Sequence, residues 1–223
     1  MRQLRFFLFL LLPLLLPGQD WRSLFNGRDL SGWEVRGAGT WTVLKDGTLF
    51  GQRTPPNAKM PFPSWPLDEK QFRTWRGKQA WLYTAKADFD EFDLELEYLL
   101  GPGANSGVSI RDTSRGECAI SGGPTPSHIG YEIQLSQNPV GVYPSGSVYG
   151  LVKAKAKYDR EYDWNKLEIL SRRDLIRVRV NGQLAAEYSG DPARPKVGPI
   201  GLQVHDAFTW VMFRNIRIRD VRR

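Results

Sequence analysis

Polar side chains that could recognise a sugar recur at strand spacing in two segments of this chain. The first segment runs from Gly103 to Arg111, and the second contains Glu132 and Gln134. Because alternate residues of a β-strand point to the same face, we expect Arg111, Glu132 and Gln134 to lie together on one polar face. Sugar hydroxyls need paired hydrogen-bond donors and acceptors, and the apolar face of a sugar ring stacks on aromatic side chains. The pattern therefore favours a carbohydrate site.

The chain contains two histidines, His128 and His205. They are too few for a multi-histidine metal site, but either could serve as a base near neutral pH. On a strand, His205 would share a face with Gln203, whereas His128 is expected in a loop just before Glu132. A histidine that only stabilises the fold is the alternative interpretation of both.

Four carboxylates alternate with apolar residues between Glu91 and Glu97. A strand would place all four on one face. The first five residues imitate the E-x-D-x-E pattern of retaining β-glucanases, in which two carboxylates about 5 Å apart support a covalent glycosyl-enzyme mechanism through Glu91 and Glu95. The same alternation is typical of any strand with one solvated face, and we favour that interpretation.

The sequence contains no motif of a serine hydrolase, a zinc protease, a phosphate-binding loop or a dinucleotide-binding fold. Serine hydrolysis, phosphoryl transfer and hydride transfer are therefore disfavoured. No spacing of Asp and Glu resembles a defined cation-binding loop. The sequence assigns no cofactor and leaves the participation of a divalent cation open.

Almost every periodic segment has a period of two residues and is bounded by Gly, Pro, Asn or Asp. This pattern is typical of antiparallel β-sandwiches and barrels. Asn181-Gly182 between two β-rich segments is a strong hairpin signal, and no long amphipathic helix competes. We therefore predict an all-β protein, an antiparallel β-sandwich. Its strands are expected over residues 41–44, 48–51, 92–99, 108–111, 131–135, 147–151, 165–171, 175–180, 183–188, 198–204 and 211–219.

The first 18 residues have the features of a secretory signal peptide. Arg2 and Arg5 precede an apolar stretch from Phe6 to Leu16, and the small residue Gly18 follows. The stretch is shorter than the roughly 20 apolar residues that a membrane-spanning helix needs. We therefore expect a secreted or periplasmic protein with a single domain over residues 19–223 and no integral membrane segment after signal removal.

The composition limits both the covalent cross-links and the partners. The single cysteine, Cys118, excludes an intramolecular disulfide. The formal net charge is +7, but the basic residues are scattered among acidic ones and do not form the stripe that nucleic-acid binding needs. We therefore expect no nucleic-acid partner, and the oligomeric state stays open.

One segment, residues 52–80, interrupts the regular strand spacing. It contains five prolines interleaved with Phe62, Trp65, Phe72 and Trp75. Loops of this length without secondary structure are commonly lids or binding loops. The alternative is that the aromatic residues pack over an exposed sheet edge. We predict that residues 52–80 are an insertion in the domain.

Six blocks in the chain form a recognisable series. They are Ser23–Trp33, Asn105–Gly107 with Arg111, Gly130–Gln134, Gly146–Gly150, Trp164–Asn165, and Gly201–Gln203 together with Phe213–Ile216. Together these blocks resemble the 3-keto-disaccharide hydrolase family, which is common among secreted bacterial proteins. Their order and spacing cover nearly the whole chain after the signal peptide.

The resemblance implies a concanavalin-like jelly roll and cleavage of glycosides that are already oxidised to a ketone at C3. A C3 ketone acidifies the proton on C2, so a general base can remove that proton and expel the C1 substituent by β-elimination. Water can then add to the resulting enone. The implied substrate is a 3-keto-glycoside or 3-keto-disaccharide, and the outcome, hydrolysis or elimination, stays open.

By matching positions, the resemblance makes Glu132 and His205 the acid–base candidates and Arg111 the electrostatic partner of the ketone or enolate. The residues that would bind sugar hydroxyls are Asn105, Gln134, Tyr149 and Gln203. A non-catalytic, lectin-like glycan-binding module on the same fold is the alternative function.

The chain departs from the family pattern near this site. Many relatives have an Asp two residues after the Gln of Tyr-Glu-x-Gln, where this chain has Ser136. The segment between Gln203 and Phe213 is expanded and carries Asp206 and Trp210 where a Gly-rich turn is more usual. These differences, with the 52–80 insertion, predict a changed substrate range.

Overall fold

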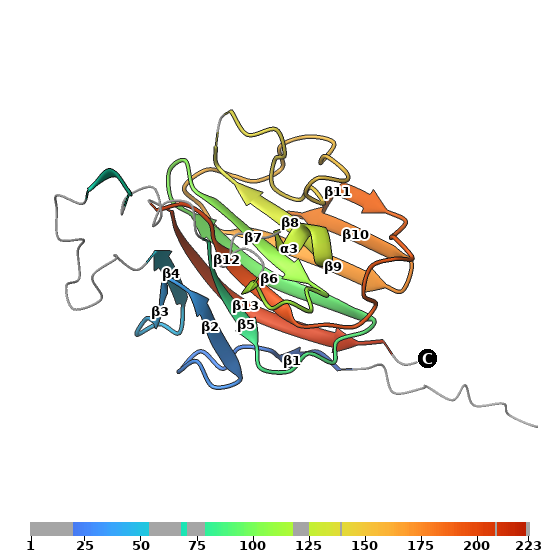
Figure 1. Ribbon diagram of the computed structural model, residues 1–223, viewed down its shortest axis with the longest axis horizontal. Helices are drawn as coiled ribbons and strands as arrows, with labels where there is room; N and C mark the ends of the chain where they lie inside the picture. Colours follow the sequence, from blue (N-terminus) through green and yellow to red (C-terminus); the bar gives the residue numbers. More distant parts are fainter. Residues whose placement is uncertain are drawn as a thin grey trace, which may run out of the picture.

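Two antiparallel β-sheets make up nearly all of the described chain (Figure 1). The structure, a computed structural model, describes residues 20–53, 68–70, 79–117, 125–138, 140–207 and 209–221. The predicted signal peptide and most of the predicted 52–80 insertion lie outside the described residues. Of the helices in the described part, none has the length and apolar character needed to cross a membrane.

The larger sheet contains eight strands and is called the large sheet below. In spatial order it consists of β11 (Gln183–Tyr188), β10 (Leu175–Val180), β9 (Asn165–Arg172), β6 (Phe92–Leu100), β13 (Trp210–Asp220), β4 (Leu49–Arg53) and β3 (Gly39–Val43), with β1 (Arg22–Ser23) paired to β13. Neighbouring strands are antiparallel throughout.

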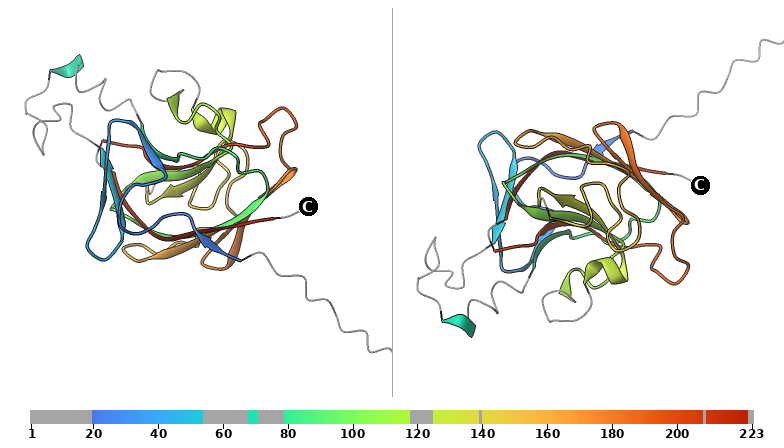
Figure 2. Two further views of the ribbon diagram at one scale, coloured as in Figure 1. Left: turned by 90° about the horizontal axis from the view of Figure 1, so that it is seen from below. Right: turned by 90° about the horizontal axis from the view of Figure 1, so that it is seen from above.

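The smaller sheet, called the small sheet below, contains five strands. They are β2 (Trp33–Gly37), β5 (Ala80–Thr84), β12 (Ile200–Val204), β7 (Asn105–Ile110) and β8 (Tyr131–Ser136), in that order across the sheet. The short helix α3 (Pro126–Ile129) lies on the side of the small sheet that faces away from the large sheet (Figure 2). The two sheets form a sandwich, which confirms the predicted all-β antiparallel architecture.

The core lies between the sheets and follows directly from the period-two sequence pattern. On β6, Phe92, Leu94 and Leu96 are at most 1% exposed, whereas the residues between them are partly exposed. Their partners across the core include Val108 and Ile133 of the small sheet, which are fully buried. Alternating apolar residues therefore give each sheet one inner face.

Sequence analysis missed the strands β1, β2 and β5. β5 is buried at all five positions because both faces of the small sheet are covered, so its sequence shows no polar face. The predicted strand over residues 147–151 is wrong. There, Val148 forms isolated bridges to Ile133 and Val152, and the intervening residues turn. The helix α3 was also missed.

Candidate functional site

The outer face of the small sheet carries the polar residues that the sequence singled out. Register pairs Ser109 of β7 with Glu132 of β8 and with Gly201 of β12. Because Val108 and Ile133 point into the core, alternation places Ser109 and Glu132 on the outer face. Two residues further along β12 and β8, Gln203 and Gln134 share this face. The predicted gathering of Glu132, Gln134 and Gln203 is therefore present.

Glu132 is a buried carboxyl group with a near-neutral pKa. Its side chain and backbone together are 4% exposed. Burial raises the pKa of Glu132 from 4.5 to about 7, although the nearby His205 and a hydrogen bond from Gln203 act in the opposite direction. A carboxyl group with a pKa near the working pH can both accept and donate a proton efficiently. Glu132 is therefore suited to general acid–base chemistry.

Amide side chains lie near Glu132 on its own strand β8 and on β7 and β12. Gln134 Nε2 donates a hydrogen bond to Asn105 Oδ1 at 2.9 Å, and Gln203 Nε2 donates to Gln79 Oε1 at 3.2 Å. Gln203 is fully buried, and within the described structure its Oε1 has no hydrogen-bond partner. A buried acceptor left without a donor costs free energy, so a hydroxyl that reached this oxygen would form a favourable hydrogen bond.

His205 lies directly after β12, at the edge of this group. Its backbone N–H donates to the Asn105 carbonyl at 3.3 Å, and its side chain is 37% exposed. His205 Nδ1 lies 3.0 Å from Asp206 Oδ1. Because a carboxylate only accepts, this contact favours a hydrogen on Nδ1 and leaves Nε2 for a ligand. Asp206, one of the residues that departs from the family pattern, thus orients the histidine.

Arg111 does not join this group, and its predicted placement beside Glu132 and Gln134 is wrong. β7 ends at Ile110, and Arg111 has a left-handed backbone with φ 61°, so the strand alternation does not extend to it. Its guanidinium is buried and donates to the carbonyls of Arg172 at 2.7 Å and Asp90 at 3.2 Å. Arg111 therefore ties the end of β7 to the large sheet.

Tyr149 follows a short segment that lies along the edge of β8. Its backbone N–H donates to the Glu132 carbonyl at 2.8 Å. Val148, the preceding residue, is fully buried and forms an isolated bridge to Ile133 of β8, and Tyr149 lies in the turn that follows it. It is 38% exposed. The structure thus brings Asn105, Glu132, Gln134, Gln203 and His205 together on the outer face of the small sheet, and it places the Tyr149 backbone beside Glu132.

Sequence analysis missed two aromatic residues and an aspartate on the same face. Trp81 and Tyr83 of β5 pair with Gln203 and Gly201 of β12 and are fully buried. The Tyr83 hydroxyl donates a hydrogen bond to Asp112 Oδ2 at 2.6 Å. Asp112 Oδ2 also accepts the Gly116 N–H at 2.8 Å, which holds the following turn over the two rings. The spacing of Trp81 and Tyr83, two residues apart as on one face of a strand, is the sequence feature that could have identified them.

Gly107 makes room for the Glu132 side chain. An alanine Cβ at position 107 would lie 2.7 Å from Glu132 Oε1, with no backbone atom among its three nearest neighbours. Gly107→Ala is therefore expected to displace the carboxyl group while keeping the fold, because the end of a flexible side chain moves more easily than backbone. We expect an activity loss of about 10-fold or more. Steady-state kinetics and thermal unfolding check this, and a folded variant with full activity would contradict it.

His128 has a local structural contact instead of a place in this group. It lies in α3, and its Nδ1 is 2.8 Å from Thr125 Oγ1. Within the described ranges, no cluster of three or more His, Cys, Asp or Glu side chains is arranged to hold a metal ion.

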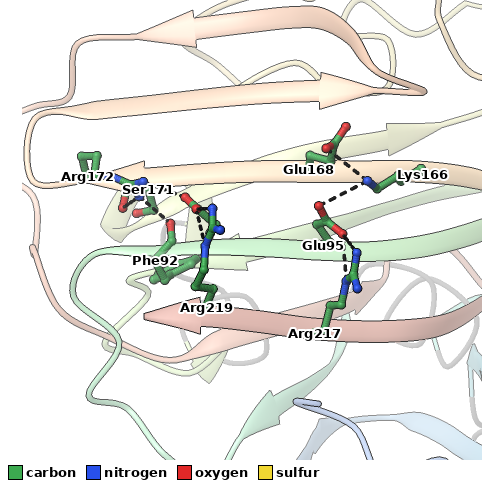
Figure 3. Close-up of polar contacts among 9 residues, drawn as sticks. Phe92, Glu95, Lys166, Glu168, Ser171, Arg172, Arg217 and Arg219 are labelled. Carbon is green, nitrogen blue, oxygen red and sulfur yellow. Dashed lines mark hydrogen bonds and ion pairs between the residues drawn. The ribbon is translucent and has the colours of Figure 1, made fainter. Parts of the chain in front are cut away.

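The carboxylates between Glu91 and Glu97 lie on the outer face of the large sheet, far from Glu132 in the sandwich. Glu95 is held between two cations, with Oε2 2.5 Å from Arg217 Nη2 and Oε1 3.2 Å from Lys166 Nζ (Figure 3). Glu91 Oε1 accepts the Arg173 N–H at 2.8 Å. These cross-strand pairs are typical of a solvated sheet face and support the structural interpretation of this segment.

Comparisons with known proteins agree with this architecture. Residues 20–219 match the family described as the 3-keto-alpha-glucoside-1,2-lyase-like domain. A candidate glycosyl hydrolase from Parabacteroides distasonis has a similar structure, with a TM-score of 0.66, 21% identity, and coverage of 91% of this chain and 100% of that chain. No curated protein matches this chain.

Two solved structures from Bacillus subtilis share the sandwich fold at lower identity. A protein with a galectin-like fold matches with a TM-score of 0.60 and 12% identity, covering 92% of this chain and 96% of that chain. A carbohydrate-binding module matches with a TM-score of 0.53 and 15% identity, covering 85% of this chain and 96% of that chain. At these identities the similarity concerns the fold alone. The family match over residues 20–219 confirms the resemblance seen in the six sequence blocks, and the chain belongs to the 3-keto-alpha-glucoside-1,2-lyase-like domain family.

Proposed function

We propose that this protein cleaves 3-keto-glycosides, with Glu132 as the general base. The observation that carries the proposal is a buried carboxyl group whose pKa is raised to about 7, on a sheet face lined with amide groups. About half of the Glu132 side chains are then ionised at neutral pH, so the base is available without a large free-energy cost.

In the proposed reaction, the Glu132 carboxylate accepts the proton from C2 of the sugar. The electrons of the C2–H bond form the C1–C2 double bond as the C1–O bond breaks, and the C3 ketone stabilises the negative charge that develops. The leaving group takes up a proton, for which the His205 imidazolium is the candidate donor through Nε2, because the ring lies at the edge of the site and its Nδ1 hydrogen is held by Asp206. Addition of water to the enone would complete net hydrolysis.

The amide groups suit the recognition of the sugar. Gln134 and Asn105 are fixed by their mutual hydrogen bond, and Gln203 Oε1 is a buried acceptor that a hydroxyl can satisfy. Paired donors and acceptors in a buried setting discriminate strongly between hydroxyl patterns, because a missing partner leaves a buried group unsatisfied.

The experiment compares a 3-keto-glucoside with its unoxidised parent, following release of the leaving group and ultraviolet absorbance from an enone. We expect release from the keto sugar alone. Because the ionised form of Glu132 is the base, kcat/KM should rise with pH through an apparent pKa near 7. Transient enone absorbance would indicate elimination before water adds.

The second candidate function is a lectin-like glycan-binding module, which the exposed tyrosine and the amide groups beside Glu132 would also suit. Saturable glycan binding without release from either substrate would favour this function and contradict the proposed catalysis.

A further inference from the structure

An arginine occupies a core-facing position at the end of β4. Leu49 and Arg53, at the two ends of this strand, are buried, and the residues next to them, Phe50 and Gln52, are more exposed. Alternation therefore points Arg53 to the same inner side of the large sheet as Leu49. The residue is 4% exposed. Burying a charge is costly unless the charged group is paired and hydrogen-bonded, so the contacts of Arg53 must offset this cost.

The Arg53 guanidinium joins the large sheet to the end of β12. Its Nε donates to the Ala38 carbonyl, directly before β3, at 3.1 Å. Its Nη1 donates to the His205 carbonyl, directly after β12, at 3.2 Å. A planar guanidinium donates its hydrogen bonds in a fixed fork, so two such contacts also fix its orientation. Arg53 therefore holds the backbone at His205 against the large sheet.

Arg53 also lies close to the carboxylate that orients the His205 ring. Burial lowers the pKa of the Arg53 guanidinium to about 10, and the negative charge of Asp206 acts in the opposite direction. Asp206 Oδ1 in turn lies 3.0 Å from His205 Nδ1. A neighbouring cation favours the ionised form of a carboxylate, which is the form that only accepts hydrogen bonds. Arg53 thus acts on His205 both through the backbone carbonyl and through Asp206.

Contacts from β7 hold the backbone of the same segment from the other side. The His205 N–H donates to the Asn105 carbonyl at 3.3 Å. The Asn105 N–H donates to Thr209 Oγ1 at 3.2 Å, and the Thr209 N–H donates to the Asp206 carbonyl at 3.1 Å. These bonds fix the backbone of the turn, whereas Arg53 lies beside the carboxylate that contacts the ring. Its loss should therefore disturb the His205 ring more than the turn.

We infer that Arg53 is a positioning residue, which holds Asp206 and His205 so that the histidine ring keeps Nε2 for the leaving group. The inference rests on the proposed function, in which His205 gives a proton to the leaving group, and adds the residue that keeps this donor in place. In this role Arg53 does not contact the substrate. Its loss should therefore slow the chemical step more than it weakens binding.

The kinetic experiment uses methyl 3-keto-glucoside, whose alkoxide leaving group needs a proton. We expect Arg53→Met to lower kcat by about 10- to 100-fold and to change KM by less than about 2-fold, because the proton donor is misplaced and the sugar contacts stay. In a His205→Gln background, the same substitution should lower kcat by less than about 2-fold, because both residues act on one proton transfer. An equal loss in both backgrounds would overturn the inference.

Two further variants serve as controls. The Arg172 guanidinium also donates to backbone carbonyls, those of Phe92 at 2.9 Å and Ser171 at 3.1 Å (Figure 3). It pairs with Asp93 at 2.7 Å on the outer face of the large sheet, so Arg172→Met should leave kcat unchanged within about 2-fold. Arg53→Lys keeps the charge but not the fork of donors. It should lose less kcat than Arg53→Met, and it tests the inference if Arg53→Met does not fold.

Histidine NMR separates this inference from the proposed catalysis. The chain has two histidines, so the ring signals of His205 are those lost in His205→Gln. At one pH, we expect Arg53→Met to move the His205 signals toward their positions in Asp206→Ala, whereas the signals of His128, which contacts Thr125, should stay in place. Unchanged His205 signals would overturn the inference whether or not a 3-keto-glucoside is cleaved. Absence of turnover by the wild type, with the His205 signals moved as expected, would contradict the proposed function alone.

Discussion

Glu132→Gln is expected to abolish turnover of a 3-keto-glycoside and, at the same time, to stabilise the fold above pH 7. Loss of a general base typically lowers kcat by about 10²- to 10⁴-fold. Gln has nearly the same shape as Glu and keeps an acceptor oxygen for the hydrogen bond from Gln203. Binding of the sugar should therefore be largely kept, so the loss should appear in kcat and not in KM.

The stabilising effect follows from the raised pKa of Glu132. A raised carboxyl pKa means that the folded state binds the proton more tightly than the unfolded state, so stability falls as pH rises between 4.5 and about 7. The difference between these two values corresponds to about 3 kcal/mol. Glutamine does not ionise, so the variant avoids this cost. The advantage of Glu132→Gln over the wild type should therefore grow by up to about 3 kcal/mol from pH 4.5 to pH 8.

Denaturant unfolding of both proteins across this pH range checks the stability effect. Glu187→Gln is the control, because Glu187 is a half-exposed carboxylate paired with Arg177 on the large sheet, and its effect should stay within about 1 kcal/mol at every pH. A stability difference between Glu132→Gln and the wild type that does not change with pH would contradict the raised pKa. Full turnover by Glu132→Gln would remove this carboxylate from the mechanism.

Arg111→Met is expected to destabilise the fold by about 3 to 5 kcal/mol. The buried guanidinium donates hydrogen bonds to carbonyls of Asp90, Arg172 and Arg173, and methionine would remove this donor from all three. Both side chains have a Cβ, so the left-handed backbone at this position costs a similar amount in each protein. The loss should thus reflect the missing hydrogen bonds.

Arg177→Met provides the matched control for this substitution. The Arg177 side chain is 37% exposed and pairs with Glu187 on the solvated face of the large sheet, so its removal should cost at most about 1 kcal/mol. Chemical denaturation measures both variants. If Arg111→Met were as stable as Arg177→Met but had lost activity, the carbonyl contacts would not be the main role of Arg111. Arg111 would then again be the candidate partner of the enolate.

The sequence by itself determined the strand architecture and most of the site face. Alternation of polar and apolar residues is a local property of an extended chain, so Glu132, Gln134 and Gln203 could be assigned to outer faces before their strands were known to be neighbours. The same pattern identified β6, β9 and β10 almost to the residue. The family resemblance then brought these separate segments to one site.

Only the tertiary structure decided which groups meet and in what environment. The left-handed backbone at Arg111 ended the alternation and turned the side chain toward the large sheet. The contact between Tyr143 and Tyr149 depends on how one loop folds against the edge of β8. The pKa of Glu132 depends on burial by parts of the chain distant in sequence. Each of these results from long-range packing, which a local pattern of residue types does not encode.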